Sequence, residues 1–271
     1  MEPVLITPEL AIANSEIKIS EELLAYAKTL CSTYQNNLPS PHITLKNLFS
    51  KDYLRQVCTE LDTISFFDGE KNFYGSQKKK YLGDITKFPS KTQQLLLYLN
   101  SKPFLDFLEG LTGIEGLISD PTYEGGGFHA ISKGGFLKVH TDFNFHKKLK
   151  LDRRLNVLIY LNENWLPEYG GEIELWDKEC KEKVVSMPPE LGNIMIFSTT
   201  DYSYHGHPDP LNCPEGVYRK SLALYYYSNG RPANEVKSKN TNTNYHERPD
   251  EKFAPANLKE KLKLAVKKIT G

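Results

Sequence analysis

Short apolar runs separated by Gly- and Pro-containing turns occupy the middle of the chain, between about residues 121 and 230. Runs of this length, bounded by turn residues, are typical of β-strands. The clearest runs cover 136–142, 154–162, 172–176, 194–197 and 221–228. Several short strands at close intervals favour a β-sandwich or a double-sheet jelly roll.

The first part of the chain, residues 1–120, has the spacing of amphipathic helices, in which apolar side chains recur three and four positions apart. Serine caps and a final glycine mark helix boundaries, because a serine hydroxyl accepts from free first-turn amides and glycine adopts the left-handed C-terminal cap. The predicted helices begin at Ser20, at Ser50 and near Ser90, and a fourth covers 103–111 before Gly113. We expect them to pack outside the β-core, with 41–45 as a short edge strand.

The end of the chain, residues 231–271, carries a polar, turn-rich segment and then an amphipathic stretch over 257–269. The apolar face of this stretch consists of Leu258, Leu262, Val266 and Ile269, with lysines opposite. We expect this helix to dock on the body of the protein; binding to a membrane surface or a partner is the alternative. The sequence therefore predicts a single domain, 1–271, with a support region (1–120), a β-core (121–230) and a C-terminal segment (231–271).

Composition argues against several classes of function. Lys and Arg number 34 and Asp and Glu also number 34, so no net charge points to nucleic acid or to an anionic membrane. No apolar stretch is long enough to span a bilayer, and the start lacks the features of a signal peptide. The scattered cysteines suggest reduced thiols: Cys31, Cys58, Cys180 and Cys213. These features predict a cytoplasmic protein and leave its oligomeric state open.

His140-Thr141-Asp142 is the candidate for metal chemistry. Side chains two apart on a strand share a face, so His140 and Asp142 converge while Thr141 faces away. His205 can supply a second imidazole; His207 competes with it, and we favour His205 because it comes first after the apolar run at 194–197. Two imidazoles and one carboxylate form the ligand set of non-haem Fe(II) oxygenases, which leaves positions open for oxygen chemistry.

Arg219-Lys220-Ser221 adds a cationic fork that can hold a carboxylate end-on. With it, five sequence elements stand in a fixed order: Gly-Gly-Phe-Leu-x-x-His-Thr-Asp, Leu-Asn-Val-Leu-Ile-Tyr-Leu-Asn-x-x-Trp, Tyr-Gly-Gly-Glu-Ile-Glu-Leu-Trp, Tyr-His-Gly and Arg-x-Ser. Over roughly residues 121–230 this order resembles the prolyl-4-hydroxylase-like branch of the Fe(II)/2-oxoglutarate-dependent dioxygenases. The resemblance implies a double-stranded β-helix, a cupin-like jelly roll with helices packed on one sheet.

By position, the resemblance implies that His140, Asp142 and His205 bind Fe(II). Related halogenases lack the carboxylate ligand, so Asp142 favours hydroxylation. The implied reaction consumes dioxygen and 2-oxoglutarate, hydroxylates an unactivated C–H bond and releases succinate and carbon dioxide, with ascorbate as the reductant. The favoured substrate is a prolyl residue in a peptide or protein. The alternatives are hydroxylation of a free small metabolite such as an amino acid, and a non-catalytic sensor that binds metal and 2-oxoglutarate.

The resemblance also implies residues that hold 2-oxoglutarate. Arg219 would pair with its distal carboxylate, and Ser221 would donate a hydrogen bond beside it. Strand alternation puts Tyr160 on one face with Asn156 and Leu158, which makes Tyr160 the candidate for a further hydroxyl contact. A last polar candidate of the same pocket is His129.

The sequence also predicts where two further segments and two further histidines lie in the structure. Segment 66–81 mixes aromatic residues, glycines and a basic run, and suits a loop over a pocket. The basic segment 147–154 can attract an acidic ligand, although a solvated loop is the favoured interpretation. His146 is expected at the surface, and His42 is expected to be structural.

Overall fold

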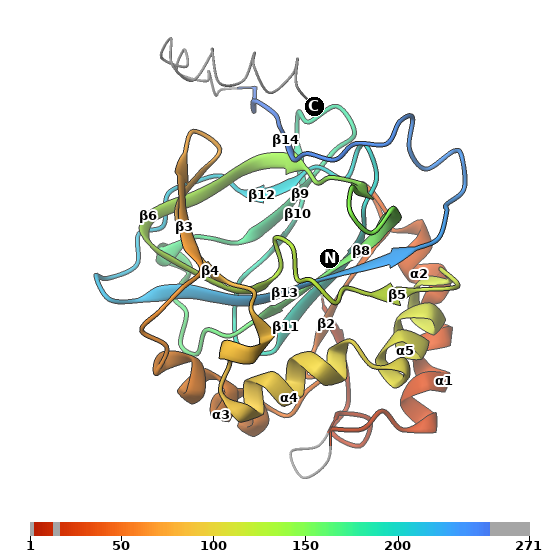
Figure 1. Ribbon diagram of the computed structural model, residues 1–271, viewed down its shortest axis with the longest axis horizontal. Helices are drawn as coiled ribbons and strands as arrows, with labels where there is room; N and C mark the ends of the chain where they lie inside the picture. Colours follow the sequence, from red (N-terminus) through yellow and green to blue (C-terminus); the bar gives the residue numbers. More distant parts are fainter. Residues whose placement is uncertain (1–2, 13–16, 250–271) are drawn as a thin grey trace.

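A curved β-sheet with helices along one side makes up the structure, a computed structural model in which residues 3–12 and 17–249 are described (Figure 1). The helices are α1 (Glu21–Thr29), α2 (Cys31–Asn36), α3 (Lys51–Asp62), α4 (Ser90–Leu99) and α5 (Lys102–Thr112). The strands of the first part are β1 (Val4–Leu5), β2 (His42–Lys46), β3 (Gly69–Phe73), β4 (Ser76–Leu82) and β5 (Ile118–Ser119). The strands that follow are β6 (Gly127–Thr141), β7 (Phe145–His146), β8 (Leu151–Tyr160), β9 (Ile173–Trp176), β10 (Lys183–Met187), β11 (Asn193–Ser198), β12 (His205–His207), β13 (Tyr218–Ser228) and β14 (Asn244–Tyr245).

The long strand β6 connects the two layers of the sheet. In the described residues the strands pair in the order β1-β2-β11-β8-β13-β6-β12-β9-β10, with β4 and β14 also paired to β6. The first half of β6 pairs with β13 and its second half with β12, so one strand of 15 residues enters both layers. This curled arrangement confirms the predicted jelly-roll core with supporting helices.

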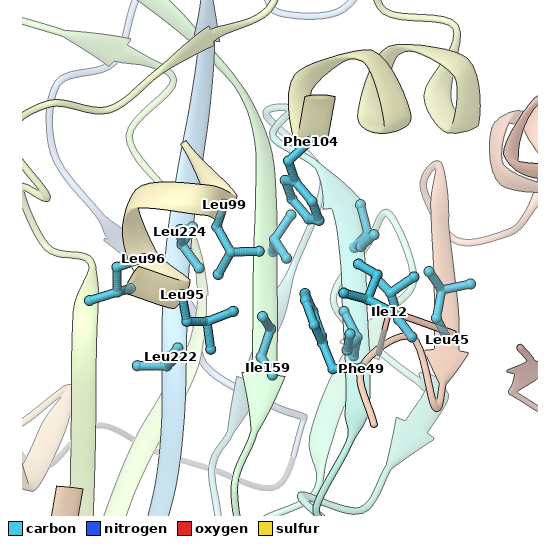
Figure 2. Close-up of a cluster of buried hydrophobic side chains, with 14 of the residues drawn as sticks. Ile12, Leu45, Phe49, Leu95, Leu96, Leu99, Phe104, Ile159, Leu222 and Leu224 are labelled. Carbon is cyan, nitrogen blue, oxygen red and sulfur yellow. The ribbon is translucent and has the colours of Figure 1, made fainter. Parts of the chain in front are cut away.

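Alternation along β13 divides the helix-covered face from the inner face of the barrel. Leu222 and Leu224 belong to the main hydrophobic cluster, where α4 contributes Leu95, Leu96 and Leu99 (Figure 2). Ser221 and Ala223, on the opposite face, line a central cavity. The helices therefore cover one side of the sheet with apolar contacts and leave its inner side free to carry polar groups.

The predicted helix boundaries are confirmed. The hydroxyl of Ser20 accepts from the amide of Leu23 at 3.1 Å, and that of Ser50 accepts from the amide of Tyr53 at 3.2 Å. Helix α5 ends at Gly113 in the left-handed conformation, with φ of 72°. Among the described helices, none is both long and apolar enough to cross a membrane.

Three predictions about local structure were wrong. Strand β2 is not an edge strand, because β1 pairs with it in parallel on the side opposite β11. Segment 66–81 is largely a hairpin of β3 and β4 that pairs with β6 rather than a loop. The basic segment 147–154 is not a solvated loop throughout, because β8 begins at Leu151 and both Arg153 and Arg154 are buried. The predicted helix over 257–269 lies outside the described residues, and the division at 120 and 230 stays a prediction.

Candidate active site

Pairing between β6 and β12 brings three candidate metal-binding side chains together. His205 lies opposite His140 in the antiparallel register, and Asp142 follows His140 by two positions. Nε2 of His205 is 3.3 Å from Oδ2 of Asp142, and Nε2 of His140 is 3.6 Å from Oδ1 of the same carboxylate. One potential ligand atom from each of the three residues lies within 4.8 Å of the others, so this group could hold a metal ion.

Backbone carbonyls orient both imidazoles toward that common point. Nδ1 of His140 is 2.8 Å from the carbonyl oxygen of Lys138, and Nδ1 of His205 is 2.9 Å from that of Ser203. A carbonyl can only accept, so each Nδ1 carries the proton and each Nε2 presents its lone pair toward Asp142. Two imidazoles oriented in this way beside a carboxylate fit the donor set of a non-haem Fe(II) site.

Burial and charge hold these groups in the ionisation states that metal binding needs. Burial, reinforced by His205, lowers the pKa of His140 to about 3. Burial alone would raise the pKa of Asp142, but Arg153 and the two imidazoles together hold it well below its usual range. The histidine is therefore neutral and the aspartate ionised near neutral pH, so neither proton has to be displaced by an incoming cation.

Arg153 and Asn156, both on β8, hold the carboxylate of Asp142. Nη2 of Arg153 donates to Oδ2 at 2.9 Å, and Nδ2 of Asn156 donates to the same oxygen at 2.7 Å. The Arg153 guanidinium also lies over the rings of Tyr225 and Phe143, with its carbon 3.4 Å and 4.5 Å from the two ring centroids. Sequence reasoning missed Arg153, which it had placed in a solvated basic loop.

The predicted carboxylate anchor, Arg219, lies buried on the same inner surface. Its Nη2 donates to the hydroxyl of Tyr160 at 3.2 Å, and its Nε donates to the carbonyl of Gly171 at 2.5 Å. A side chain at Gly171 would collide with Arg219, since an added Cβ would lie 2.9 Å from Cδ, so the glycine permits this approach. Ser221 pairs with Tyr160 across β13 and β8 and faces the same space.

These groups line one cavity of about 280 Å³. The structure thus brings together every residue predicted for the metal and for 2-oxoglutarate: His140, Asp142, His205, Arg219, Ser221 and Tyr160. Asn156, Leu158 and Tyr160 share the inner face, as alternation predicted. His129 also lines the cavity, and its Nε2 is 3.1 Å from the carbonyl of Gly125.

The other histidines take different places. His207 is buried and lines the cavity, but it lies opposite Leu137 and outside the group that could hold the metal. His146 is buried as well, contrary to the prediction, because its ring packs edge-on against Tyr227. His42 is fully buried in β2 and does not line the cavity.

An outer groove of about 900 Å³ opens next to the cavity. The two spaces share four lining residues: Lys71, Phe143, Thr243 and Tyr245. The Tyr245 ring centroid lies 5.5 Å from that of His140, and Tyr245 also packs edge-on against Phe73 and Tyr74. The polar, turn-rich segment after residue 230 therefore contributes β14 to this wall, through its pairing with β6.

Comparison with known proteins agrees with this geometry. Residues 126–227 match the 2OG-Fe(II) oxygenase superfamily. The chain is 24% identical over 198 residues to the Prolyl 3-hydroxylase OGFOD1 of Mus musculus, and the match covers 70% of this chain and 33% of that protein. The chain therefore spans about a third of the length of this curated relative.

Solved prolyl hydroxylases share the fold. A Pseudomonas putida prolyl-4-hydroxylase is 18% identical with a TM-score of 0.54, and the match covers 76% of this chain and 100% of that one. A Trichoplax adhaerens prolyl hydroxylase, solved in complex with a hypoxia inducible factor oxygen degradation domain peptide fragment, is 20% identical with a TM-score of 0.56. That match covers 79% of this chain and 95% of the other.

Proposed function

Because this chain is a prolyl-4-hydroxylase-like 2OG-Fe(II) oxygenase, we propose that it hydroxylates a prolyl residue in a peptide or protein. Fe(II) and 2-oxoglutarate, when bound, supply the oxidising chemistry that puts one atom of dioxygen into the C–H bond, with release of succinate and carbon dioxide. Ascorbate is the proposed reductant in solution.

His140, Asp142 and His205 are the proposed Fe(II) ligands. Their support is the convergence of two Nε2 atoms and a carboxylate, with both Nδ1 atoms engaged by backbone carbonyls. Ligands fixed in this way bind the metal without reorganising, because rotation of either ring would break its carbonyl hydrogen bond. Arg153 and Asn156 keep the carboxylate ionised and oriented.

Arg219 is the proposed partner of the distal carboxylate of 2-oxoglutarate, with Tyr160 and Ser221 beside it. A buried guanidinium pairs strongly with a carboxylate, because the donor fork matches the two oxygens and little water competes. Within the described residues, no carboxylate of the protein forms an ion pair with Arg219, so its charge is available to a ligand.

The outer groove supports a polypeptide substrate over a small metabolite. It exceeds the inner cavity in volume, about 900 Å³ against about 280 Å³, and it continues into that cavity. Its wall carries Phe73, Tyr74 and Tyr245 beside the other residues of 241–246. Such a surface can receive residues on either side of a proline while the proline ring enters the cavity.

Oxygen incorporation into peptides tests the proposal. The protein is incubated with Fe(II), 2-oxoglutarate, ascorbate and a library of proline-containing peptides, and the peptides are analysed by mass spectrometry for a gain of one oxygen atom. We expect hydroxyproline and stoichiometric succinate, with both lost in His140→Ala and retained in Asp106→Ala, a control at an exposed helix carboxylate. Oxygen gained by free amino acids but by no peptide would favour the metabolite alternative. Binding of both cofactors without oxidation of any compound would favour the sensor.

A further inference from the structure

Lys79 places a second cation inside the barrel. It lies on β4, opposite Ile131 of β6, which in turn lies opposite Arg219 of β13. Paired residues of adjacent strands point to the same face, so Lys79 and Arg219 both project inward from backbones two strand spacings, about 10 Å, apart. Only 7% of Lys79 is exposed, and it lines the same cavity as the candidate metal site.

The ammonium group of Lys79 lacks a protein partner in the described part of the chain: it appears in none of the ion pairs or side-chain hydrogen bonds found there. The neighbouring buried cations differ, because Arg153 pairs with Asp142 and Arg154 pairs with Glu235. Burying a charge without a partner is costly, so such a group in a cavity points to an anion that completes it.

Lys71 extends this positive surface toward the solvent. It lies on β3 and lines both the inner cavity and the outer groove. Within the described residues, neither acidic residue of the cavity wall forms an ion pair with these lysines: Asp142 pairs with Arg153, and Glu124 lies 3.4 Å from His146 with more than half of its side chain exposed. The β3–β4 hairpin therefore presents a cationic path from the groove to the metal site.

We propose that Lys79, assisted by Lys71, binds a carboxylate of the substrate, so that preferred substrates carry a carboxylate near the carbon that is oxidised. This inference rests on the proposed hydroxylase function and specifies its substrate class. The carboxylate belongs either to an Asp or Glu side chain of a peptide or to a free main-chain carboxyl group. In this scheme Arg219, on β13, binds 2-oxoglutarate, and Lys79, on β4, is available to bind the substrate.

The titration of Lys79 agrees with this assignment. Burial, and then the charge of Lys71, lowers the pKa of Lys79 to about 7. A carboxylate that enters the cavity favours the charged ammonium and so restores its proton. Without substrate, Lys79 is partly neutral near pH 7, so its burial costs less free energy. When an acidic substrate binds, the charged form is favoured.

Matched acid and amide substrates test the proposal. One pair is a proline peptide with Asp beside the proline and its Asn counterpart; the other is proline and prolinamide. For each of the four compounds we measure the rate of turnover and the affinity for the anaerobic protein loaded with Zn(II) and 2-oxoglutarate. The variants are Lys79→Met and Lys79→Gln, and the control is Lys80→Met on the opposite face of β4, where Nζ lies 5.3 Å from the ring centroid of Tyr218.

We expect wild type and Lys80→Met to prefer the acid in at least one pair by roughly tenfold or more, as a charge-assisted contact predicts. Both Lys79 variants should lose this preference while the KM for 2-oxoglutarate stays near wild type. The pair that shows the preference identifies the source of the carboxylate. Equal binding of acid and amide in both pairs, or a preference that survives in the Lys79 variants, would overturn the proposal. Acid-selective binding without turnover would instead refute the hydroxylase function and leave the subsite standing.

Discussion

Arg153 holds Asp142 by an ion pair of 2.9 Å between Nη2 and Oδ2, and the arginine side chain is almost fully buried. The carboxylate receives its second hydrogen bond from Asn156, at 2.7 Å. Both donors bind the same oxygen, which leaves Oδ1 toward His140. Two residues of β8 thus hold the carboxylate on β6: both orient it, and Arg153 also supplies the opposite charge.

Substitution of Arg153 should weaken metal binding. Arg153→Gln removes the charge that keeps Asp142 ionised and oriented, and loss of such a supporting group lowers metal affinity by about 10- to 100-fold. The affinity is measured by competition with a coloured chelator. Arg154→Gln is the matched control, because it removes a buried arginine that pairs instead with Glu235. An unchanged affinity in Arg153→Gln would show that Asn156 alone holds the carboxylate.

The sequence could not reveal the role of Arg153, although it predicted Asp142, the residue with which Arg153 pairs. Alternation counted back from Tyr160 along β8 turns Arg154 inward. The pairing of β8 with β13 shifts by one residue between Leu155 and Arg153, and this bulge turns Arg153 inward instead. A bulge depends on the register of both strands, which a local pattern of apolar residues does not contain.

Local patterns predicted a β-sandwich or jelly roll, the helix caps and the convergence of His140 with Asp142, because each depends on a few neighbouring residues. Family resemblance then favoured the jelly roll and implied the roles of Arg219, Ser221 and Tyr160 in binding 2-oxoglutarate. The basic segment 66–81 was predicted over a pocket, but its hairpin and the outer groove were not, since Lys79 and Tyr245 reach the cavity through pairing of β4 and β14 with β6 over long sequence separations. Burial of a lysine by tertiary pairing overrides its usual preference for solvent.

His205 and His207 should differ sharply in their effect on the metal. His205→Ala removes an Nε2 atom that lies 3.3 Å from Asp142 and should abolish high-affinity metal binding. His207→Ala should leave metal affinity near wild type, because His207 lies outside the group that could hold the ion. Metal content after dialysis against trace iron distinguishes the two variants. Loss of metal from both to the same degree would contradict the assignment.

Removal of the Tyr160 hydroxyl should weaken the binding of 2-oxoglutarate. Tyr160→Phe takes away the acceptor that holds Nη2 of Arg219 at 3.2 Å, and a hydrogen bond to a charged group contributes about 1.5 kcal/mol, or roughly tenfold. The KM for 2-oxoglutarate in succinate formation reports the effect. Tyr226→Phe is the matched control, since its buried hydroxyl donates to the carbonyl of Leu99 on the helix-covered side. Equal KM values in the two variants would place the cosubstrate elsewhere.

His42 should make the protein less stable in acid. Its ring is fully buried in β2, with Nδ1 2.8 Å from the carbonyl of Ser40, and burial lowers its pKa below the ordinary value of 6.5. The unfolded chain therefore takes up this proton at a higher pH than the native protein does. Native stability is unaffected well above pH 6.5, and it falls by up to about 1.4 kcal/mol per pH unit as the pH drops from there toward the folded pKa.

The variant His42→Gln isolates this contribution from those of other groups that titrate in acid. Urea unfolding is measured at several pH values across and below the unfolded pKa, with a chelator present so that metal release does not contribute. We expect the free energy of unfolding to decline less steeply with acid in His42→Gln than in wild type, by up to one proton per molecule. The comparison uses the slope, so a uniform loss of stability from the substitution does not obscure it. Parallel slopes for the two proteins would show that the buried ring accepts a proton in the native state as readily as in the unfolded chain.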